Sequence, residues 1–212
     1  MITPETWFGN FEAYNTTWLP VVIISWFALI ICTYLLFAKP SDKTNLLMKA
    51  CLAFIFAWNG IVFFFGYMTN SAIPGGIPMI VIAFLFTVDI FRNKIKFRLP
   101  EARWQKYLTL FLIVWALGLY TIAAWLTGHS YPRGPLLVAP CPMTIFAIAL
   151  LSTAMPTLKI NRYLITVHFI LLLWWAFFSG LGAPFHFGFY VDLTLFATGV
   201  YGLGMLVRYW KV

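Results

Sequence analysis

Long apolar stretches separated by short polar connections run along the whole chain of 212 residues. A helix needs about 20 predominantly apolar residues to cross the hydrocarbon core of a membrane. The pattern therefore predicts an all-α membrane protein, a seven-transmembrane helix bundle that forms one domain over residues 1–212. The seven windows that meet the length requirement are residues 17–37, 46–68, 72–91, 106–127, 136–156, 161–181 and 187–208.

The fifth window is preceded by a stretch that cannot be a continuous helix, "GHSYPRGPLLVAPCPMTIF" (128–146). Proline inside a helix removes a hydrogen bond and clashes with the preceding turn, but it suits the first turn of a helix. The fifth helix is therefore expected to begin near Cys141 and to end near Met155, which is roughly 15 residues or about 22 Å. Four prolines interrupt the stretch: Pro132, Pro135, Pro140 and Pro142.

Such a helix is shorter than the ~30 Å hydrocarbon core, so residues 135–140 must enter the outer leaflet as non-helical backbone. Non-helical backbone is tolerated at membrane depth only where protein or a water-filled cavity satisfies its polar groups. The first turn of the helix also offers unpaired N–H groups, which transporters use to hold ions and anionic groups. The stretch is interpreted as a re-entrant segment facing an outer cavity; the alternative is an ordinary loop before a proline-trimmed helix.

The distribution of lysine and arginine predicts the orientation of the bundle. Of 14 cations, only Arg133 falls on the side opposite to the others. Because cytoplasmic loops carry an excess of lysine and arginine, we expect the C terminus in the cytoplasm and the N terminus outside, in the inner (plasma) membrane. Only 9% of the residues are charged, against about 25% in a soluble domain. The net charge of +8 is therefore a topology signal, and membrane lipids rather than nucleic acid are the expected surroundings.

The N-terminal residues "MITPETWFGNFEAYNTTW" are acidic where a signal peptide would be basic, so the first apolar window is expected to stay as a membrane anchor. The basic connection at residues 92–106 is expected to act as the topology determinant; the alternative is a segment on the membrane surface that holds anionic headgroups. Asp89, three residues before Arg92, is expected to form a local helix pair with it.

Polar residues from several windows are expected to reach one outer cavity. Asp192 lies about one turn inside the seventh window, and an ionisable group inside the hydrocarbon is a functional hypothesis by default. Its expected partner is Arg133, the only cation on that side; the alternative is a structural ion pair or hydrogen bond at the interface. The candidate binding residues are Asn15, Trp58, Asn59, His129, Tyr131, Arg133, Cys141, His186 and Asp192.

Cys141 stands at the predicted helix start, where a thiol can serve as a soft metal ligand or a reactive group; the alternative is a small packing residue. His129, Cys141 and His186 could together hold a metal ion, although their spacing carries no metal signature. His168, in the middle of the sixth window, fits a proton relay or a neutral imidazole bonded to nearby backbone.

Several function classes are disfavoured. A retinal Schiff base needs a lysine buried in the membrane, and all eight lysines lie at or beyond the predicted cytoplasmic boundaries, so no retinal is expected. The chain has no phosphate-binding loop and no serine–histidine–acid arrangement. Cys32, Cys51 and Cys141 show neither disulfide nor metal-finger spacing.

The motifs "YNTTWLP" (14–20), "WNG" (58–60), "GHSYPRGP" (128–135) and "APCPMTIF" (139–146) resemble an uncharacterised family of prokaryotic integral membrane proteins, number 6064 among the domains of unknown function. The resemblance covers most of the chain. Met143 stands where the family pattern has a threonine, which removes one hydroxyl from the helix start. The resemblance implies a multi-span membrane protein and no activity.

Three function classes follow from the sequence. A transporter or channel for a small molecule or ion is favoured, because Asn59, His168 and Asp192 could line a polar path between helices. A membrane-embedded enzyme or metal-binding protein that uses a metal or thiol is the first alternative. The second is a sensor or accessory subunit of a membrane complex. The substrate and the oligomeric state stay open.

Overall fold

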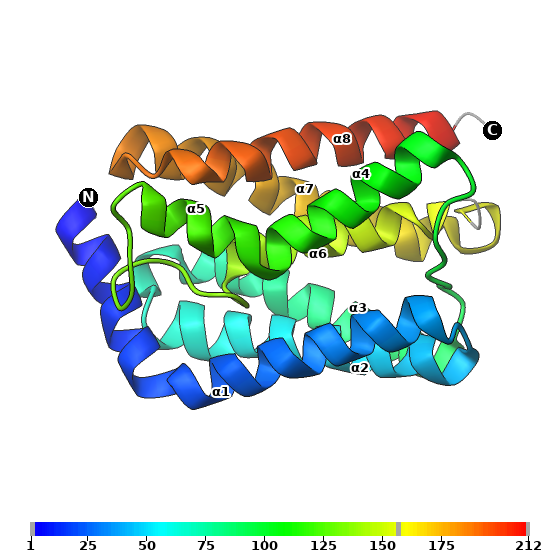
Figure 1. The fold of residues 1–212 in the computed structure, drawn as a ribbon, viewed down its shortest axis with the longest axis horizontal. Helices are drawn as coiled ribbons and strands as arrows, with labels where there is room; N and C mark the ends of the chain where they lie inside the picture. The colour runs from blue at the N-terminus through cyan, green and yellow to red at the C-terminus, as the bar shows by residue number, and fades with distance from the viewer. Residues whose placement is uncertain (1–2, 156–157, 211–212) are drawn as a thin grey trace.

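The computed structural model describes residues 3–155 and 158–210, without the side chains of residues 158–161, as helices joined by short connections (Figure 1). Six helical rods are long and apolar enough to cross a membrane, and α6 (Pro140–Ser152) is a shorter seventh. The predicted helical bundle is confirmed. The rods other than α6 are α1 (Pro4–Ala38); α2 (Asp42–Trp58) with the π-helical turn η1 (Asn59–Phe64); η2 (Thr69–Ser71), η3 (Ala72–Gly76) and α3 (Ile77–Arg92); α4 (Arg103–Val114), η4 (Trp115–Leu119) and α5 (Tyr120–Leu126); α7 (Leu158–Phe187); and η6 (Tyr190–Asp192) with α8 (Leu193–Trp210).

Two helices are longer than the hydrophobic windows predict. α1 begins at Pro4 because the Thr3 side chain accepts a hydrogen bond from the Thr6 backbone and caps the helix. α7 continues to Phe187 and ends where Gly188 takes a left-handed conformation with φ of 71°. The windows 161–181 and 187–208 place His186 in the connection between two predicted helices, and this placement is wrong, since His186 belongs to the last turn of α7.

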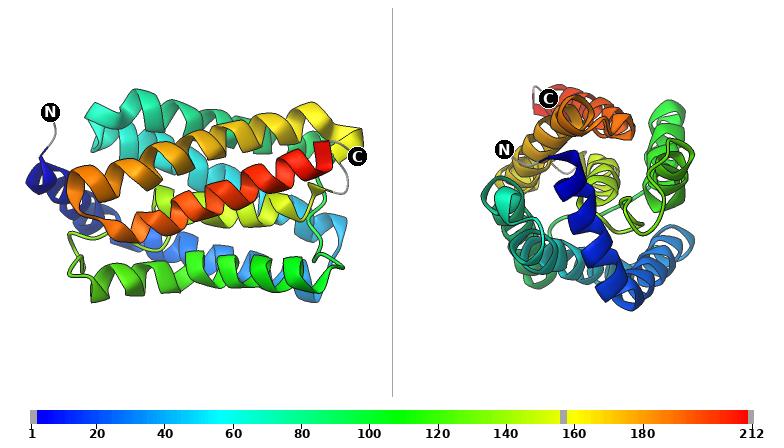
Figure 2. Two further views of the ribbon diagram at one scale, coloured as in Figure 1. Left: turned by 90° about the horizontal axis from the view of Figure 1, so that it is seen from above. Right: turned by 90° about the vertical axis from the view of Figure 1, so that its left-hand side faces the viewer.

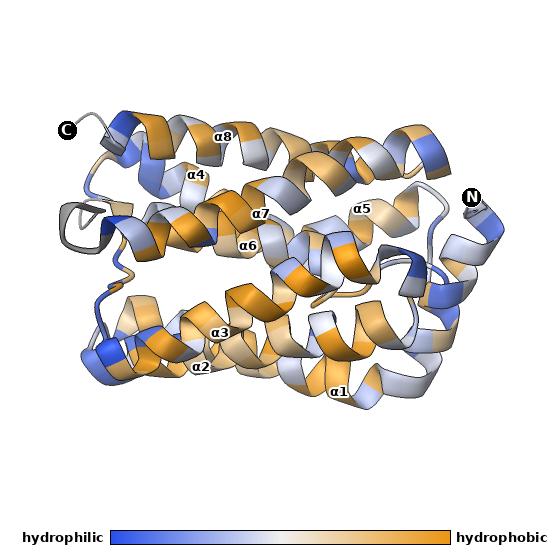
Figure 3. Ribbon diagram, turned by 180° about the vertical axis from the view of Figure 1, so that it is seen from behind, coloured by the Kyte–Doolittle hydropathy of each residue, from blue (hydrophilic) through white to orange (hydrophobic). Residues whose placement is uncertain are grey.

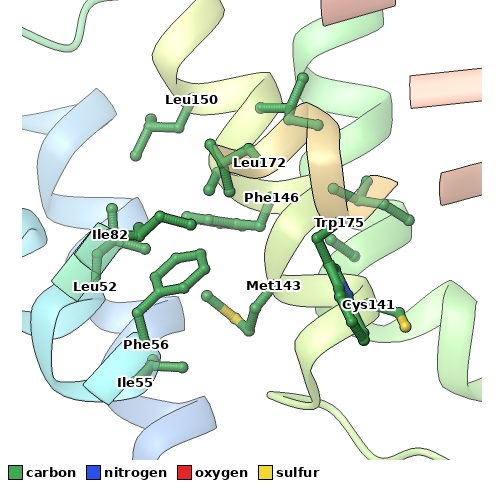
Figure 4. Close-up of a cluster of buried hydrophobic side chains, with 14 of the residues drawn as sticks. Leu52, Ile55, Phe56, Ile82, Cys141, Met143, Phe146, Leu150, Leu172 and Trp175 are labelled. Atoms are coloured by element: carbon green, nitrogen blue, oxygen red, sulfur yellow. The ribbon is translucent and has the colours of Figure 1, made fainter. Parts of the chain in front are cut away.

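The predicted short helix is α6, which begins one residue before Cys141 and has 13 residues, about 20 Å. All of its residues are buried, as expected for a helix that is apolar on every side. In the end-on view of Figure 2, α6 lies inside the bundle with the other rods around it. Figure 4 shows Met143 of α6 between Phe56 of α2 and Trp175 of α7. A helix too short to span a membrane alone is thus enclosed by helices that are long and apolar enough to do so.

The two ends of the bundle differ in their polar residues. The chain termini lie at opposite ends (Figure 1), and Figure 3 shows hydrophilic residues gathered at both ends with hydrophobic residues between them. Below, the end that carries the first turn of α1 and residues 127–139 is called the outer end, because the cation excess predicts that the opposite end faces the cytoplasm. Lys159 and Lys211, two of the cations behind that assignment, lie outside the described side chains.

A buried ion pair lies near the cytoplasmic end. The Lys49 ammonium is 2.7 Å from the Asp89 carboxylate, and neither side chain is exposed. Asp89 also accepts the backbone N–H groups of Lys94 and Ile95. The predicted pairing of Asp89 with Arg92 is wrong, because the chain reverses just after α3 and brings its own backbone and Lys49 to the carboxylate.

The connection after α3 closes the cytoplasmic end instead of lying on the membrane surface. Asn93 takes a left-handed conformation with φ of 46° and ends α3. The following residues Ile95 and Phe97 are fully buried. The Phe97 N–H donates to Asn45 Oδ1 at 2.7 Å, which ties the connection to α2. The segment that carries Ile95 and Phe97 therefore fills the space between the helix ends. We call this segment the plug.

We expect Lys49→Met to reduce the free energy of unfolding by about 3–5 kcal/mol, because it leaves the buried Asp89 carboxylate without a cation. Adding Asp89→Asn removes that charge and keeps an oxygen for the backbone donors, so the double variant should regain most of the loss. Denaturant unfolding in detergent measures both. Lys43→Met, at an exposed lysine of the same helix, is the control. A double variant as unstable as Lys49→Met would contradict this account.

Candidate functional site

The non-helical segment before α6 runs inside the bundle and is held by two asparagines. Asn15 Nδ2 of α1 donates to the carbonyl oxygens of Pro132 and Gly134, at 2.7 and 2.8 Å. Asn59 Nδ2, at the start of η1, donates to Val138 O at 2.9 Å. Both asparagines are buried. Buried non-helical backbone is thus satisfied by protein side chains, as the re-entrant interpretation requires.

Four polar side chains meet where this segment enters α6. Tyr120 of α5 donates its hydroxyl proton to Asp192 Oδ1. On Oδ2, Ser179 of α7 donates at 3.2 Å and Cys141 of α6 at 3.3 Å. The Cys141 sulfur and the Ser179 hydroxyl lie 3.4 Å apart. We call these four residues the Asp192 cluster; all are buried, and they come from four different elements.

The local sequence brings these elements close enough to touch. Gly180 follows Ser179, and a Cβ atom at Gly180 would lie 2.7 Å from the backbone nitrogen of Phe196 in α8. Only glycine allows α7 and α8 to approach this closely, and the approach places Ser179 beside the start of α8. Asp192 ends the short 3₁₀ turn η6 there, while Cys141 sits in the first turn of α6.

The expected pairing of Asp192 with Arg133 is wrong. Arg133 Nε lies 3.7 Å from Glu12 Oε2, and both side chains are about half exposed at the outer surface. The N-terminal extension of α1 carries Glu12 to that position. Among the described residues no cation lies within ion-pair distance of Asp192, which is held by hydroxyl and thiol donors only.

A small cavity of about 30 Å³ adjoins the cluster, lined by Cys141, Ser179 and Tyr120. Trp7, Phe11 and Phe189 line this cavity and contact further aromatic rings. Trp7 stacks on Phe187 with ring centres 4.7 Å apart. His129 stacks on Phe8 at 4.8 Å and meets the edge of Phe189 at 5.0 Å. We call this group of residues the aromatic cap: Trp7, Phe8, Phe11, His129, Phe187 and Phe189.

The first part of α1 supplies half of the aromatic cap. In the end-on view of Figure 2, this part of α1 crosses the outer end of the bundle. Pro20 lies inside α1 and removes one helical hydrogen bond, which allows the helix to bend where it leaves the bundle. The cap therefore depends on a helical segment that the hydrophobic windows left out.

The other predicted site residues are spread around the cluster. Trp58 Nε1 donates to the Tyr14 hydroxyl at 3.0 Å, in a contact between α2 and α1. Tyr131 is 42% exposed, and His186 is exposed at the end of α7. His168 is buried and its Nδ1 is 2.8 Å from Leu164 O, in line with the backbone-bonded alternative.

The metal hypothesis gains no geometric support from the described residues. Within residues 3–155 and 158–210, no group of three or more histidine, cysteine, aspartate or glutamate side chains is placed to hold a metal ion. His129 belongs to the aromatic cap, Cys141 to the Asp192 cluster, and His186 to the surface. The three predicted ligands are therefore in three different surroundings.

Sequence reasoning missed Tyr120 and Ser179. Each is a single hydroxyl within a long apolar window, which is common in membrane helices and carries little signal by itself. The weak indication for Ser179 is its place before Gly180 in "FFSGLG", since small residues mark close helix contacts in membranes. Tyr120 offers no comparable sequence signal.

The comparison with known families is informative. The chain matches the model of a family of unknown function (DUF6064) over residues 4–211. It belongs to this family. The DUF6064 match spans every residue of the Asp192 cluster and of the aromatic cap, and the resemblance predicted from the sequence motifs is confirmed. No curated protein and no solved structure matches the chain. The chemistry of this DUF6064 protein must therefore be derived from its own residues.

We expect a membrane-impermeant maleimide added outside to modify Cys141 slowly, because this residue is only 7% exposed beneath the aromatic cap. Trp7→Ala removes the central ring of the cap and should make the modification several times faster. Cys141→Ser should abolish it, and Trp104→Ala, at the cytoplasmic end, should not change it. Equal rates with and without Trp7 would show that the cap does not control access.

The pH dependence of stability tests the place of His129. Burial lowers the pKa of His129 from its ordinary value, opposed by a hydrogen bond to the Thr127 backbone. The unfolded chain therefore binds the proton at a higher pH than the folded chain does, and stability is lost as pH falls from about 6.5, the ordinary histidine pKa, toward the lowered pKa of the folded state. The apparent Tm should drop on acidification in the unchanged protein and drop less in His129→Phe, which keeps the stacking. His186→Phe is the control, and an equal drop in all three would refute the assignment.

Proposed function

We propose that this protein is an ion-coupled transporter of the plasma membrane, with a proton or a small monovalent cation binding at Asp192 from the outer side. The proposal rests on the position of the Asp192 carboxyl group. It is fully buried in the outer half of an apolar bundle, where an ionisable side chain is costly and is retained for function more often than for stability.

The surroundings of Asp192 favour exchange of a small cation. An ion pair would hold the carboxylate in one charge state, but the described contacts of Asp192 come from Tyr120, Cys141 and Ser179, which are neutral. Hydroxyl groups can turn to accept hydrogen bonds or to bind a cation when the carboxyl group changes its state. The cluster therefore fits a site that binds and releases positive charge.

The size of the adjoining cavity supports an ion over a larger substrate. A cavity of about 30 Å³ has room for water-sized guests and falls far below the roughly 300–1,000 Å³ of small-molecule pockets. A membrane enzyme acting on an organic substrate at Cys141 would need more room than this. The Cys141 thiol donates a hydrogen bond to the Asp192 carboxylate, so an enzyme that uses Cys141 remains the alternative. The two functions can be separated by experiment, because transport would depend on Asp192 and catalysis on Cys141.

The buried polar groups lie at separate levels along the bundle. His168 stands on the same helix as Ser179, eleven residues or about 16 Å toward the cytoplasm. The Lys49–Asp89 pair lies near the cytoplasmic end. Between these levels, α6 contributes only the apolar, buried residues Ile145 to Leu151. A continuous open channel is disfavoured by this layering, and a carrier that changes shape is favoured.

Charge displacement in proteoliposomes on a solid support tests the proposal without knowledge of the transported substrate. A step to acidic pH, or a step in sodium concentration, should produce a transient current. Asp192→Asn should abolish the current, because the amide takes up no proton at neutral pH and lacks the negative charge that attracts a cation. Glu12→Gln, at the exposed outer carboxylate, should leave it intact.

Cys141→Ser separates the two functional classes, since serine keeps a donor to Asp192 but lacks the thiol. The current should persist in Cys141→Ser if Asp192 is the binding group. A current that survives Asp192→Asn would overturn the proposal. No current in the unchanged protein under either step would do the same.

A further inference from the structure

A polar pocket opens at the cytoplasmic end, where the plug meets the turn between α1 and α2. Its volume is about 350 Å³, within the roughly 300–1,000 Å³ of ligand pockets. Figure 1 shows the connection after α3 passing beside this turn. Two hydrogen bonds join the segments, from the Phe97 N–H to Asn45 Oδ1 and from Lys96 Nζ to Asp42 Oδ1. The walls of the pocket are therefore held together by contacts between distant parts of the chain.

The plug has an apolar face and a basic face. Ile95 and Phe97 are fully buried, whereas Lys94 and Arg98 are exposed and Lys96 is partly exposed. In an extended backbone, successive side chains point to opposite sides, and the burial of these residues follows that alternation. The residues that fill the space between the helix ends thus alternate with cations that face outward, and two of these cations, Lys96 and Arg98, line the pocket.

The charges around the pocket favour an anionic ligand. The Lys96 ammonium pairs with Asp42 Oδ1 at 2.6 Å, but it has three donors and can bind a further oxygen. Arg98 forms no ion pair among the described residues, and a guanidinium can hold two phosphate oxygens at once. Lys39 and Lys43 belong to the adjoining turn and are exposed. Four cations against one carboxylate leave this region positive.

The apolar part of the pocket favours a lipid over a free anion. Leu36 and Phe37, in the last turn of α1, line the pocket together with Leu99 of the connection. The two α1 residues end the apolar window 17–37, so the neighbouring cations lie at the level of the headgroups if α1 crosses the membrane. Basic pockets on the cytoplasmic side of membrane helices bind the headgroups of anionic lipids. A free phosphate ion would gain nothing from the apolar wall.

We propose that this pocket binds the phosphate group of an anionic phospholipid of the inner leaflet. Arg98 and Lys96 donate to the phosphate oxygens, and an acyl chain runs along Phe37 toward the hydrocarbon. The bound lipid thereby ties the plug to the turn between α1 and α2. The pocket lies at the end of the bundle opposite to the Asp192 cluster, so the proposal is independent of the ion site and goes beyond it.

Two exposed arginines at the cytoplasmic end allow a matched pair of variants. Arg98→Gln removes a cation that lines the pocket. Arg103→Gln removes the same charge from the first residue of α4, which does not line it. Because the Arg98 side chain is exposed, its replacement leaves the packing of the bundle unchanged. Loss of lipid binding in Arg98→Gln can therefore be told apart from loss of the fold.

Native mass spectrometry of the delipidated full-length protein in detergent, titrated with dioctanoyl phosphatidylglycerol, counts bound lipids and gives dissociation constants. We expect one tightly bound molecule, preferred over dioctanoyl phosphatidylcholine because only the former carries a net negative charge. Arg98→Gln should weaken binding about fivefold, the effect of one basic residue near a membrane surface. Arg98→Lys should retain most of the affinity, and Arg103→Gln should bind as the unchanged protein does.

Three outcomes would overturn the proposal. The first is equal binding of the two lipids, or of neither. The second is equal weakening in Arg98→Gln and Arg103→Gln, because the general surface charge would then account for binding. The third is displacement of phosphatidylglycerol by inorganic phosphate at similar concentration, which would assign the pocket to a free anion. Asp192→Asn should leave lipid binding unchanged, so failure here and failure of the ion site are distinguishable.

Discussion

Backbone carbonyl groups inside an apolar bundle need hydrogen-bond donors, and this requirement organises the outer half of the protein. The segment before α6 cannot be helical because of its prolines, yet it runs through the interior. Asn15 and Asn59 supply the donors from two different rods, at 2.7–2.9 Å. Each asparagine thereby fixes a helix to the segment. The start of α6, and with it the position of Cys141, follows from these contacts.

A central helix of 13 residues within longer rods leaves the outer end of the bundle to be filled by other groups. The non-helical segment, the Asp192 cluster and the aromatic cap occupy this region in turn. The cytoplasmic end is filled differently, by Ile95 and Phe97 from the connection after α3. Both ends are thus closed, so any passage through the protein requires movement of the cap, the plug or both. Under the proposed transport function, this layered arrangement would suit a carrier better than a pore.

The number of helices and the start of α6 were predictable from the sequence. The thickness of the bilayer sets the length of each apolar stretch, and prolines restrict where a helix can begin, so both signals can be read from neighbouring residues. The partners of the charged residues were not. Arg133 was assigned to Asp192 because it was the only outer cation, but Glu12 reaches Arg133 from a part of α1 outside the hydrophobic window. Lys49 was interpreted as a boundary charge, although it lies fully buried against Asp89. Contacts between distant segments depend on helix rotation and bending, which hydropathy does not encode.

Departures from regular helix coincide with the residues that make these long-range contacts. Asn59 begins the π-helical turn η1, and Tyr120 directly follows the π-helical turn η4. A π turn inserts one residue into an α-helix, which rotates the following side chains and frees backbone groups, and such turns are frequent at functional sites. In η4 the Leu117 carbonyl bonds to Trp26 instead of to Thr121. One irregular turn therefore directs Tyr120 toward Asp192 and leaves the buried Thr121 hydroxyl without its usual helical acceptor, so the residues next to the site depend on a local departure from α-helix.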